Sequence, residues 1–259
     1  MKRWMFFVYG IACYLAFLAV YAWFCAFTGN VLVAKSIDAP VASSPAIAVA
    51  VNFALLLAFG AQHSVMARPA FKRVWTRIVP QPIERSTYVL ASCLAVVLLI
   101  WQWRPIDAVV WNVENTTARG VLWTLFAIGW LMVPVVSLMI NHFDLFGVRQ
   151  VWCYLRGREC QPLAFRTPWL YSHVRHPLYV AWSLAFWATP TMTAGHLLFA
   201  IGLTAYMVAA ALVEERDLLA HFGQQYAAYQ RAVPRYIPKF GKRTTTLQES
   251  QRTPSGQSL

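Results

Sequence analysis

Residues 178–213 read LYVAWSLAFWATPTMTAGHLLFAIGLTAYMVAAALV, an apolar run without a single Lys, Arg, Asp or Glu. One membrane crossing takes about 20 residues, so this run is too long for one helix and long enough for two. Thr189-Pro190, followed by Gly195, interrupts the run near its middle, and a proline ends or breaks a helix. The run therefore predicts two helices folded back on each other as a hairpin.

The rest of the chain has the composition of a membrane protein. Of its 259 residues, 59% are hydrophobic and 12% are charged, and the mean hydropathy is +0.48. Further apolar runs cover residues 5–27, 46–61, 87–101 and 120–140, and the first is too long for a signal peptide. With the hairpin they predict an all-α polytopic bundle of six crossings, or of five if the first arm of the hairpin only re-enters the membrane. We expect one domain over residues 1–240, with a core at 141–240, and a disordered tail at 241–259.

The positively charged residues are distributed unevenly between the two sides of this bundle. If the N-terminus is cytoplasmic, 19 of the 22 Lys and Arg residues lie on the cytoplasmic side, and Lys35, Arg104 and Arg119 lie opposite. The positive-inside rule then predicts cytoplasmic N- and C-termini, in what we expect to be a bacterial inner membrane. Topology and attraction to anionic lipid account for the net charge of +12, so it indicates a lipid bilayer and no nucleic acid as partner.

The five cysteines form no recognisable motif. Three lie in apolar runs, while Cys153 and Cys160 lie in a predicted cytoplasmic loop without a CxxC pair. We therefore expect neither a disulfide framework nor a zinc or other metal site.

Polar residues gather at the predicted cytoplasmic ends of the spans. Five of the six histidines lie there, and His63 and His142 stand in the polar blocks 62–64 and 141–144. The consecutive carboxylates Glu214 and Glu215 end the hairpin. Paired acids at the mouth of a membrane element are costly unless a cation lies between them, so they favour a site for a positively charged ligand. The alternatives are ordinary helix-capping histidines and a solvated charge cluster.

Several motifs in the last third of the chain occur in a fixed order. They are Arg175-His176-Pro177-x-Tyr179, the Glu214-Glu215 pair, Phe222-Gly223-x-x-Tyr226-x-x-Tyr229 and Val233-Pro234-Arg235-x-Ile237-Pro238. With them, residues 171–238 resemble the catalytic core of the isoprenylcysteine carboxyl methyltransferase superfamily of membrane methyltransferases. Two further blocks, QHSVMAR at 62–68 and NHFDLFGVRQ at 141–150, resemble its bacterial methanethiol S-methyltransferase branch.

The resemblance implies S-adenosyl-L-methionine as cofactor, bound by the terminal hairpin and the segment after it. The sequence has no Gly-rich turn between a strand and a helix, which excludes a Rossmann-type cofactor domain. By the resemblance, His176 and Tyr179 contact the adenosine, Pro177 shapes the turn, and Glu214 or Glu215 holds the ribose or the amino-acid end. The same matching segment adds three residues to the cofactor group: Tyr171, Arg175 and Tyr226.

Some of these side chains have a second interpretation. Arg149 and Arg235 suit the cofactor carboxylate, because a guanidinium grips a carboxylate through two hydrogen bonds, but they equally suit lipid headgroups. Tyr226 and Tyr229 share one helix face and fit either the site or an aromatic belt at the membrane interface.

Methylation of a thiol needs a proton acceptor, because the thiolate is the reactive nucleophile. An imidazole oriented by an acid is a common general base. We therefore expect His142 or His63 to act as the base, with Asp144 as the orienting acid, although residues two apart face different sides of a regular helix.

In the branch that this chain resembles, the acceptor is methanethiol and the product is dimethyl sulfide. A small, volatile, apolar thiol partitions into lipid, so we expect one lateral entrance from the bilayer and one entrance for the cofactor from the cytoplasm. Two other functions stay open: methylation of a larger lipidic or prenylated acceptor, and a non-enzymatic haem or nitrogen-oxide accessory protein with haem-binding histidines. A transporter is less favoured, since the charges cluster at one face.

Overall fold

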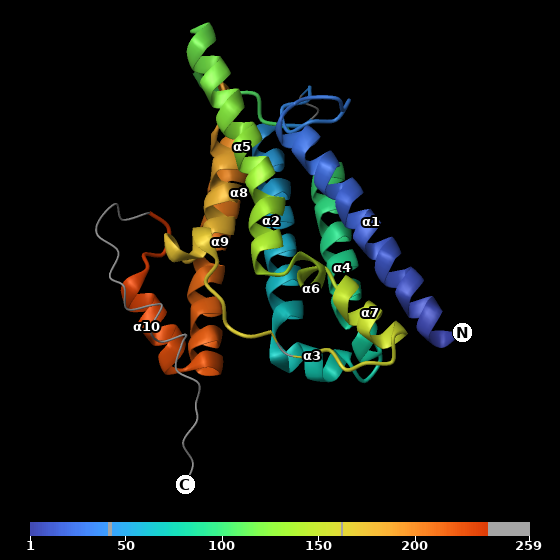
Figure 1. The fold of residues 1–259 in the computed structure, drawn as a ribbon. Helices are drawn as coiled ribbons and strands as arrows, with labels where there is room; N and C mark the ends of the chain where they lie inside the picture. Colours follow the sequence, from blue (N-terminus) through green and yellow to red (C-terminus); the bar gives the residue numbers. More distant parts are fainter. Residues whose placement is uncertain (41–42, 162, 238–259) are drawn as a thin grey trace.

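The computed structural model describes residues 1–40, 43–161 and 163–237, and its architecture is helical. Five helices have the length and apolar composition of a membrane span: α1 (Lys2–Thr28), α2 (Pro45–Ala67), α4 (Gln81–Gln102), α5 (Thr116–Ile140) and α9 (Ala194–Phe222). They lie side by side in one bundle (Figure 1). The chain is an integral membrane protein, and the predicted all-α polytopic bundle is confirmed. The tail at 241–259 lies outside the described residues.

Shorter elements connect and cap the long helices. They are α3 (Pro69–Trp75), α6 (His142–Leu145), α7 (Val148–Leu155), the 3-10 turn η1 (Trp169–Ser172) and α10 (Gln224–Ala232). Helices α3, α7 and α10 lie toward the end of the bundle that carries the N-terminus (Figure 1). This end therefore holds most of the chain that lies outside the long helices.

The predicted hairpin is present, and its two arms are unequal. Its first arm, α8 (Pro177–Trp187), has 11 residues, about 16 Å of helix and roughly half the thickness of a bilayer core. The chain then runs extended through β2 (Thr191–Thr193), which pairs antiparallel with β1 (Val109–Asn112) before α9 begins. This pairing supplies hydrogen-bond partners to backbone N–H and C=O groups that are no longer part of a helix. Without partners, such groups would be costly in lipid. The break at Thr189-Pro190 is confirmed, and the first arm is a half-length helix rather than a full span.

The helices form a closed ring. Neighbouring pairs are α1 with α4, α4 with α2, α2 with α9, α9 with α8, and α8 with α5. The ring closes between α5 and α1, where the Tyr21 hydroxyl donates to the Trp130 carbonyl at 2.5 Å. Pro134 inside α5 explains this contact, because proline lacks the N–H that would bond the carbonyl four residues earlier.

Close backbone contact fixes the position of α8 against α5. A Cβ atom at Gly129 would lie 2.5 Å from the backbone nitrogen of Ala185, so only glycine allows this approach. Buried aromatic side chains fill the centre of the ring beside this contact, among them Phe24, Trp130, Phe186 and Phe199. The second half of α8 is therefore held against α5 by close packing.

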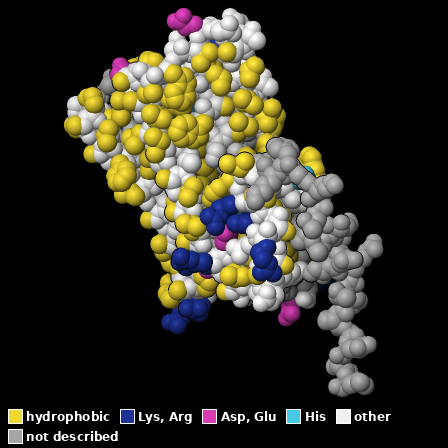
Figure 2. Space-filling view, turned by 90° about the vertical axis from the view of Figure 1, so that its left-hand side faces the viewer, with side chains coloured by type: hydrophobic (Ala, Val, Ile, Leu, Met, Phe, Trp, Pro, Cys, Tyr) yellow, Lys and Arg dark blue, Asp and Glu magenta, His cyan; other side chains and the backbone are white. Residues whose placement is uncertain are grey.

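Cations collect at one end of the molecule. Figure 2 shows Lys and Arg side chains gathered toward one end of the visible face, next to a broad hydrophobic surface. Arg68 directly follows α2, whereas the backbone of Arg104 bonds to the Asn52 side chain in the first half of α2. The two cations thus lie toward opposite ends of the bundle, in agreement with the uneven distribution in the sequence.

One covalent link differs from the sequence expectation. Cys153 in α7 and Cys160 in the following loop form a disulfide, with Cα atoms 5.7 Å apart. The loop turns back at Gly157, whose φ of +67° lies in the left-handed region that favours glycine. The expectation of no disulfide was wrong, because the pairing depends on this turn and the seven-residue separation matches no motif.

Candidate active site

Glu215 is the centre of a buried group of polar side chains where α8, α9 and α10 meet. Its carboxylate accepts a hydrogen bond from Arg175 Nε at 2.9 Å and two from Arg235, at 3.1 and 2.7 Å. His176 Nε2 donates to it at 3.0 Å and Gln230 Nε2 at 3.3 Å. The Glu215 side chain is only 5% exposed. We refer to these five residues as the Glu215 cluster.

The same cluster fastens the end of the described chain to the start of α8. The backbone N–H groups of Arg175 and His176 donate to the carbonyls of Pro234 and Arg235 at 2.9 and 3.2 Å. Hydrogen bonds to the Glu215 carboxylate hold the pKa of Arg235 above its usual value, so its charge is secure. The cluster therefore joins three segments that are far apart in sequence.

Glu214 has a different environment from its neighbour. Its side chain is 50% exposed, and its Oε2 accepts a hydrogen bond from the Tyr179 hydroxyl at 3.0 Å. His176 Nδ1 lies 3.8 Å from the same oxygen. The rings of His176 and Tyr179 are stacked, with centroids 5.1 Å apart and 7° between their planes. A half-exposed carboxylate thus lies beside a pair of parallel rings.

The two acids cannot have the same role. Both oxygens of Glu215 are already bonded to cationic or amide donors, so little acceptor capacity is left for a ligand. Glu214 accepts only the Tyr179 hydrogen bond among the described residues and is open to solvent. Of the two acids that the sequence left as alternatives, the geometry favours Glu214 as the ligand contact.

An unpaired hydroxyl marks the same place. Tyr236 has a buried hydroxyl without a hydrogen-bond partner among the described residues, and its ring centroid lies 5.8 Å from that of His176. A buried polar group without a partner is costly, and a bound ligand can supply the partner. Parallel rings, a free carboxylate and a free hydroxyl fit a ligand with a flat ring, hydroxyl groups and a positive charge. S-adenosyl-L-methionine has all three.

The predicted tyrosines pack in the interior. Tyr226 and Tyr229 are 2% and 4% exposed, so they do not form an aromatic belt facing lipid. Tyr229 donates its hydroxyl hydrogen to the Tyr171 carbonyl at 2.6 Å, and both rings of α10 contact Phe165. Burial raises the pKa of Tyr226 to about 12, which keeps its phenol neutral. The contacts give these residues a packing role next to the Glu215 cluster.

His142 is held by partners other than the predicted acid. Its Nδ1 lies 2.7 Å from Ser137 Oγ and its Nε2 lies 2.8 Å from the Tyr14 hydroxyl. Asp144 instead accepts a hydrogen bond from Arg149 Nη1 at 2.7 Å. The structure therefore does not pair Asp144 with His142, because the two side chains leave the same helical turn in different directions. Burial also lowers the pKa of His142, which favours the neutral imidazole.

His63 lies on α2 in a separate setting. Its Nδ1 is 3.3 Å from Ser92 Oγ on α4. Its ring packs on three aromatic side chains, Phe59, Tyr88 and Tyr206, with centroid distances of 5.5, 5.3 and 6.3 Å. The structure thus brings the C-terminal candidates into one group and places the two candidate bases among hydroxyls and aromatic rings.

Sequence reasoning missed several residues of these sites: Tyr14, Ser92, Ser137, Tyr206, Gln230 and Tyr236. Serine and tyrosine belong to no motif when they occur singly in apolar runs. One general signal was available, since a hydroxyl inside a span must find a hydrogen-bond partner. That signal marks Tyr14, Ser92, Ser137 and Tyr206 as bonded but does not say to which helix, and it does not apply to Gln230 and Tyr236, which lie outside the spans.

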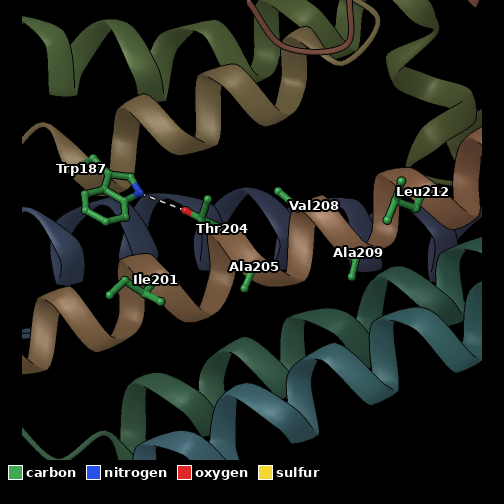
Figure 3. A pocket seen from close by; sticks show the side chains of 7 residues that line it. All are labelled: Trp187, Ile201, Thr204, Ala205, Val208, Ala209 and Leu212. Carbon is green, nitrogen blue, oxygen red and sulfur yellow. Dashed lines mark hydrogen bonds between the residues drawn. The ribbon is translucent and has the colours of Figure 1, made fainter.

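A shallow furrow lies on the outside of α9 (Figure 3). It has a volume of about 470 Å³ and is lined by Trp187, Ile201, Thr204, Ala205, Val208, Ala209 and Leu212. The Trp187 indole donates to the Thr204 hydroxyl at 2.9 Å. Glu214 lies two residues after Leu212, a rotation of about 200° around the helix. The apolar furrow therefore faces away from the polar site.

Known proteins similar to this chain extend over nearly its whole length. It is 48% identical over 237 residues to a methanethiol S-methyltransferase of Crocosphaera subtropica, with 92% of this chain and 93% of that protein covered. It is 50% identical over 238 residues to a methanethiol S-methyltransferase of Mycobacterium tuberculosis, with coverages of 92% and 98%. Nurim of Homo sapiens is 33% identical over 176 residues, with coverages of 64% and 66%. No family model and no solved structure matches the chain.

Fold and site together define a polytopic helical membrane protein with a buried ion-pair cluster and a half-exposed carboxylate at one end of its bundle. The chain belongs to the methanethiol S-methyltransferase family, as the identity and coverage of the two bacterial relatives establish. The family resemblance and the thiol S-methyltransferase class predicted from the sequence are confirmed.

Proposed function

We propose that this protein methylates methanethiol to dimethyl sulfide, with S-adenosyl-L-methionine as the methyl donor. The observation that carries the proposal is the match, over 92% of the chain, to two relatives named methanethiol S-methyltransferase. We choose S-adenosyl-L-methionine as the donor because its positive charge suits the Glu214 carboxylate and its flat adenine suits the rings of His176 and Tyr179.

We assign the cofactor contacts to residues at the junction of α8 and α9. Glu214 binds the ribose hydroxyls or the ammonium group, and the stacked rings of His176 and Tyr179 bind the adenine. Arg235, whose side chain is 35% exposed, pairs with the cofactor carboxylate while it stays bonded to Glu215. Bound there, the cofactor supplies an activated methyl group on a sulfonium. Four further residues predicted for the cofactor group support the contacting residues instead of touching the cofactor: Tyr171, Arg175, Pro177 and Tyr226.

We also propose the orientation of this site. The cations at this end of the bundle support placing the N-terminus, the C-terminus and the cofactor pocket on the cytoplasmic side of a bacterial inner membrane. We further propose a single domain over residues 1–240 with a core at 141–240.

The accessory-protein alternative finds less support in the histidines. Haem ligation needs an imidazole nitrogen with a free lone pair. Both nitrogens of His142 are hydrogen-bonded, to Ser137 and Tyr14. His63 and His142 therefore do not form the facing pair of free imidazoles that haem binding across two helices would need, which favours the enzyme.

Headspace gas chromatography tests the proposal directly. Membranes that contain the protein are supplied with S-adenosyl-L-methionine and methanethiol, and dimethyl sulfide is measured. We expect cofactor-dependent product, and its loss in the Glu214→Ala variant. Asp217→Ala is the matched control, because this exposed acid of the same helix pairs only with Arg68 among the described residues. Absence of product from the unmodified protein that still binds the cofactor would overturn methanethiol as the acceptor.

A further inference from the structure

We propose that His63, oriented by Ser92, is the catalytic base of this reaction and that His142 is a structural residue. The inference rests on the proposed function, because it assigns one step of that reaction. It separates two histidines that the sequence alone left equivalent.

The hydrogen bonds of Ser92 fix the tautomer of His63. Ser92 Oγ lies 3.0 Å from the Tyr88 carbonyl, which can only accept, so the serine proton is used there. Ser92 must then accept from His63 Nδ1, which lies at 3.3 Å and therefore carries the ring proton. In the neutral ring this leaves the lone pair on Nε2. No described residue forms a hydrogen bond with His63 Nε2, so this lone pair is available to a substrate.

The same reasoning gives the opposite result for His142. Ser137 Oγ donates to the Pro134 carbonyl at 2.8 Å, so it must accept from His142 Nδ1 at 2.7 Å. The lone pair on Nε2 is then taken by the Tyr14 hydroxyl at 2.8 Å. Both nitrogens are occupied and the residue is 7% exposed. His142 therefore ties α1 to α5 and has no free lone pair for a thiol proton.

The surroundings of His63 suit a small apolar thiol. Phe59, Tyr88 and Tyr206 form aromatic walls around the imidazole. Tyr206 also connects this place with the proposed cofactor pocket, since it lies on α9 about two helical turns before Glu214. The acceptor and the cofactor would thus meet at α9, each in an environment that matches its polarity.

A cation next to this place favours the ionised thiol. The Arg85 guanidinium lies 5.5 Å from the centre of the Tyr88 ring, and the centre of that ring lies 5.3 Å from that of the His63 ring. The other titratable groups around His63 are the phenols of Tyr88 and Tyr206, with Glu214 beyond Tyr206. A positive charge beside the Tyr88 wall favours the thiolate over the neutral thiol as it forms.

The proposed step balances in protons and electron pairs. The proton of the thiol moves to Nε2 of His63, and a sulfur lone pair forms the new bond to the methyl carbon. The bond from that carbon to the sulfonium breaks, and its electron pair stays on the departing sulfur, which becomes a neutral thioether. His63 releases the proton to solvent after the reaction.

The test compares His63→Gln with His142→Gln and Ser92→Ala, with His221→Gln as the matched control because His221 is exposed on α9. We expect kcat to fall by about 10²–10⁴-fold in His63→Gln, with unchanged cofactor affinity. The loss should shrink as the pH is raised, because solvent then supplies thiolate without a base. Ser92→Ala should lower kcat less, and His221→Gln should leave it unchanged.

Several results would overturn the assignment. One is a full rate in His63→Gln; another is a pH-independent loss, which would indicate a purely structural role. A similar drop in kcat in both His142→Gln and Tyr14→Phe, with His63→Gln active, would identify His142 as the base instead. If His63→Gln does not fold, His63→Asn and Ser92→Ala carry the same comparison. Failure of the unmodified protein to form dimethyl sulfide would overturn the proposed function itself and is seen before any variant is compared.

Discussion

The two polar regions at this end of the bundle are built in opposite ways. The Glu215 cluster places two guanidinium groups, an imidazole and an amide on one buried carboxylate. The histidine region, by which we mean His63 and His142 with their serine and tyrosine partners, uses neutral hydroxyls and aromatic rings. The first region can hold a charged ligand because its own charges are compensated, and the second can receive an apolar one. Buried ion pairs are thus concentrated where the donor would bind, whereas aromatic rings and hydroxyls surround the place of the acceptor, with the Arg85 cation beside the Tyr88 ring.

The largest effect should come from removing the centre of the charged region. Glu215→Ala leaves Arg175 and Arg235 without their shared carboxylate, and breaking a buried ion pair costs about 3–5 kcal/mol. We expect a much lower midpoint of thermal unfolding in detergent, together with loss of cofactor binding. The unfolding midpoint of Glu215→Gln, which keeps the shape of the side chain, should lie between those of Glu215→Ala and the unmodified protein. An unchanged midpoint in Glu215→Ala would show that the cluster contributes little to stability.

The neighbouring acid should separate binding from stability. Glu214→Ala removes a half-exposed carboxylate with one hydrogen bond from Tyr179, so the unfolding midpoint should hardly change. Loss of a charged hydrogen bond to the cofactor should weaken its affinity about 10- to 100-fold, measured by calorimetry or filter binding. If Glu214→Ala binds the cofactor normally, the pocket lies elsewhere.

The histidine region should respond to acid. Burial holds the pKa of His142 below its ordinary value of 6.5, whereas the unfolded chain takes up the proton near that value. The contribution of His142 to stability is therefore complete above about pH 6.5 and is lost as the pH falls below it. Thermal unfolding between about pH 7 and pH 5 should show this decline. His142→Gln should flatten the curve, and an equally steep curve in that variant would assign the decline to other groups.

The smallest effect is expected at an exposed ion pair beside the charged region. Arg68 and Asp217 are 2.7 Å apart, but their side chains are 37% and 54% exposed. Such pairs contribute about 0–1 kcal/mol, and salt screens them. Asp217→Ala should leave both the unfolding midpoint and the rate of methyl transfer close to those of the unmodified protein. A loss as large as that of Glu215→Ala would remove the distinction between buried and exposed pairs here.

The spans and the hairpin could be predicted from the sequence because lipid imposes a length and a composition on each helix. The break at Thr189-Pro190 followed from proline chemistry, but the pairing of β2 with β1 did not, because it depends on how the loops fold together. Residue type alone could also select Glu214 and Glu215 as candidate site residues. It could not say which acid is buried, since this depends on where α8 lies relative to α9.

Short-range reasoning failed where the decisive contacts are long-range. Asp144 is close to His142 in sequence and yet pairs with Arg149, while Tyr14, 128 residues away, bonds to the histidine. Ser92 and His63 are 29 residues apart on different helices. The disulfide between Cys153 and Cys160, seven positions apart, likewise depends on the left-handed turn at Gly157.

The Glu215 cluster has a consequence for how the protein is made. Its members enter the growing chain in order, from Arg175 and His176, through Glu215, to Gln230 and Arg235. The long helices are therefore all synthesised before the last guanidinium. A nascent chain that stops short of Arg235 can insert all its spans and still carry a buried carboxylate with part of its partners missing. Closure of the Glu215 cluster is thus a late event of synthesis, and a premature stop codon between the end of α9 and Arg235 would leave a chain with all its spans and an incomplete cluster.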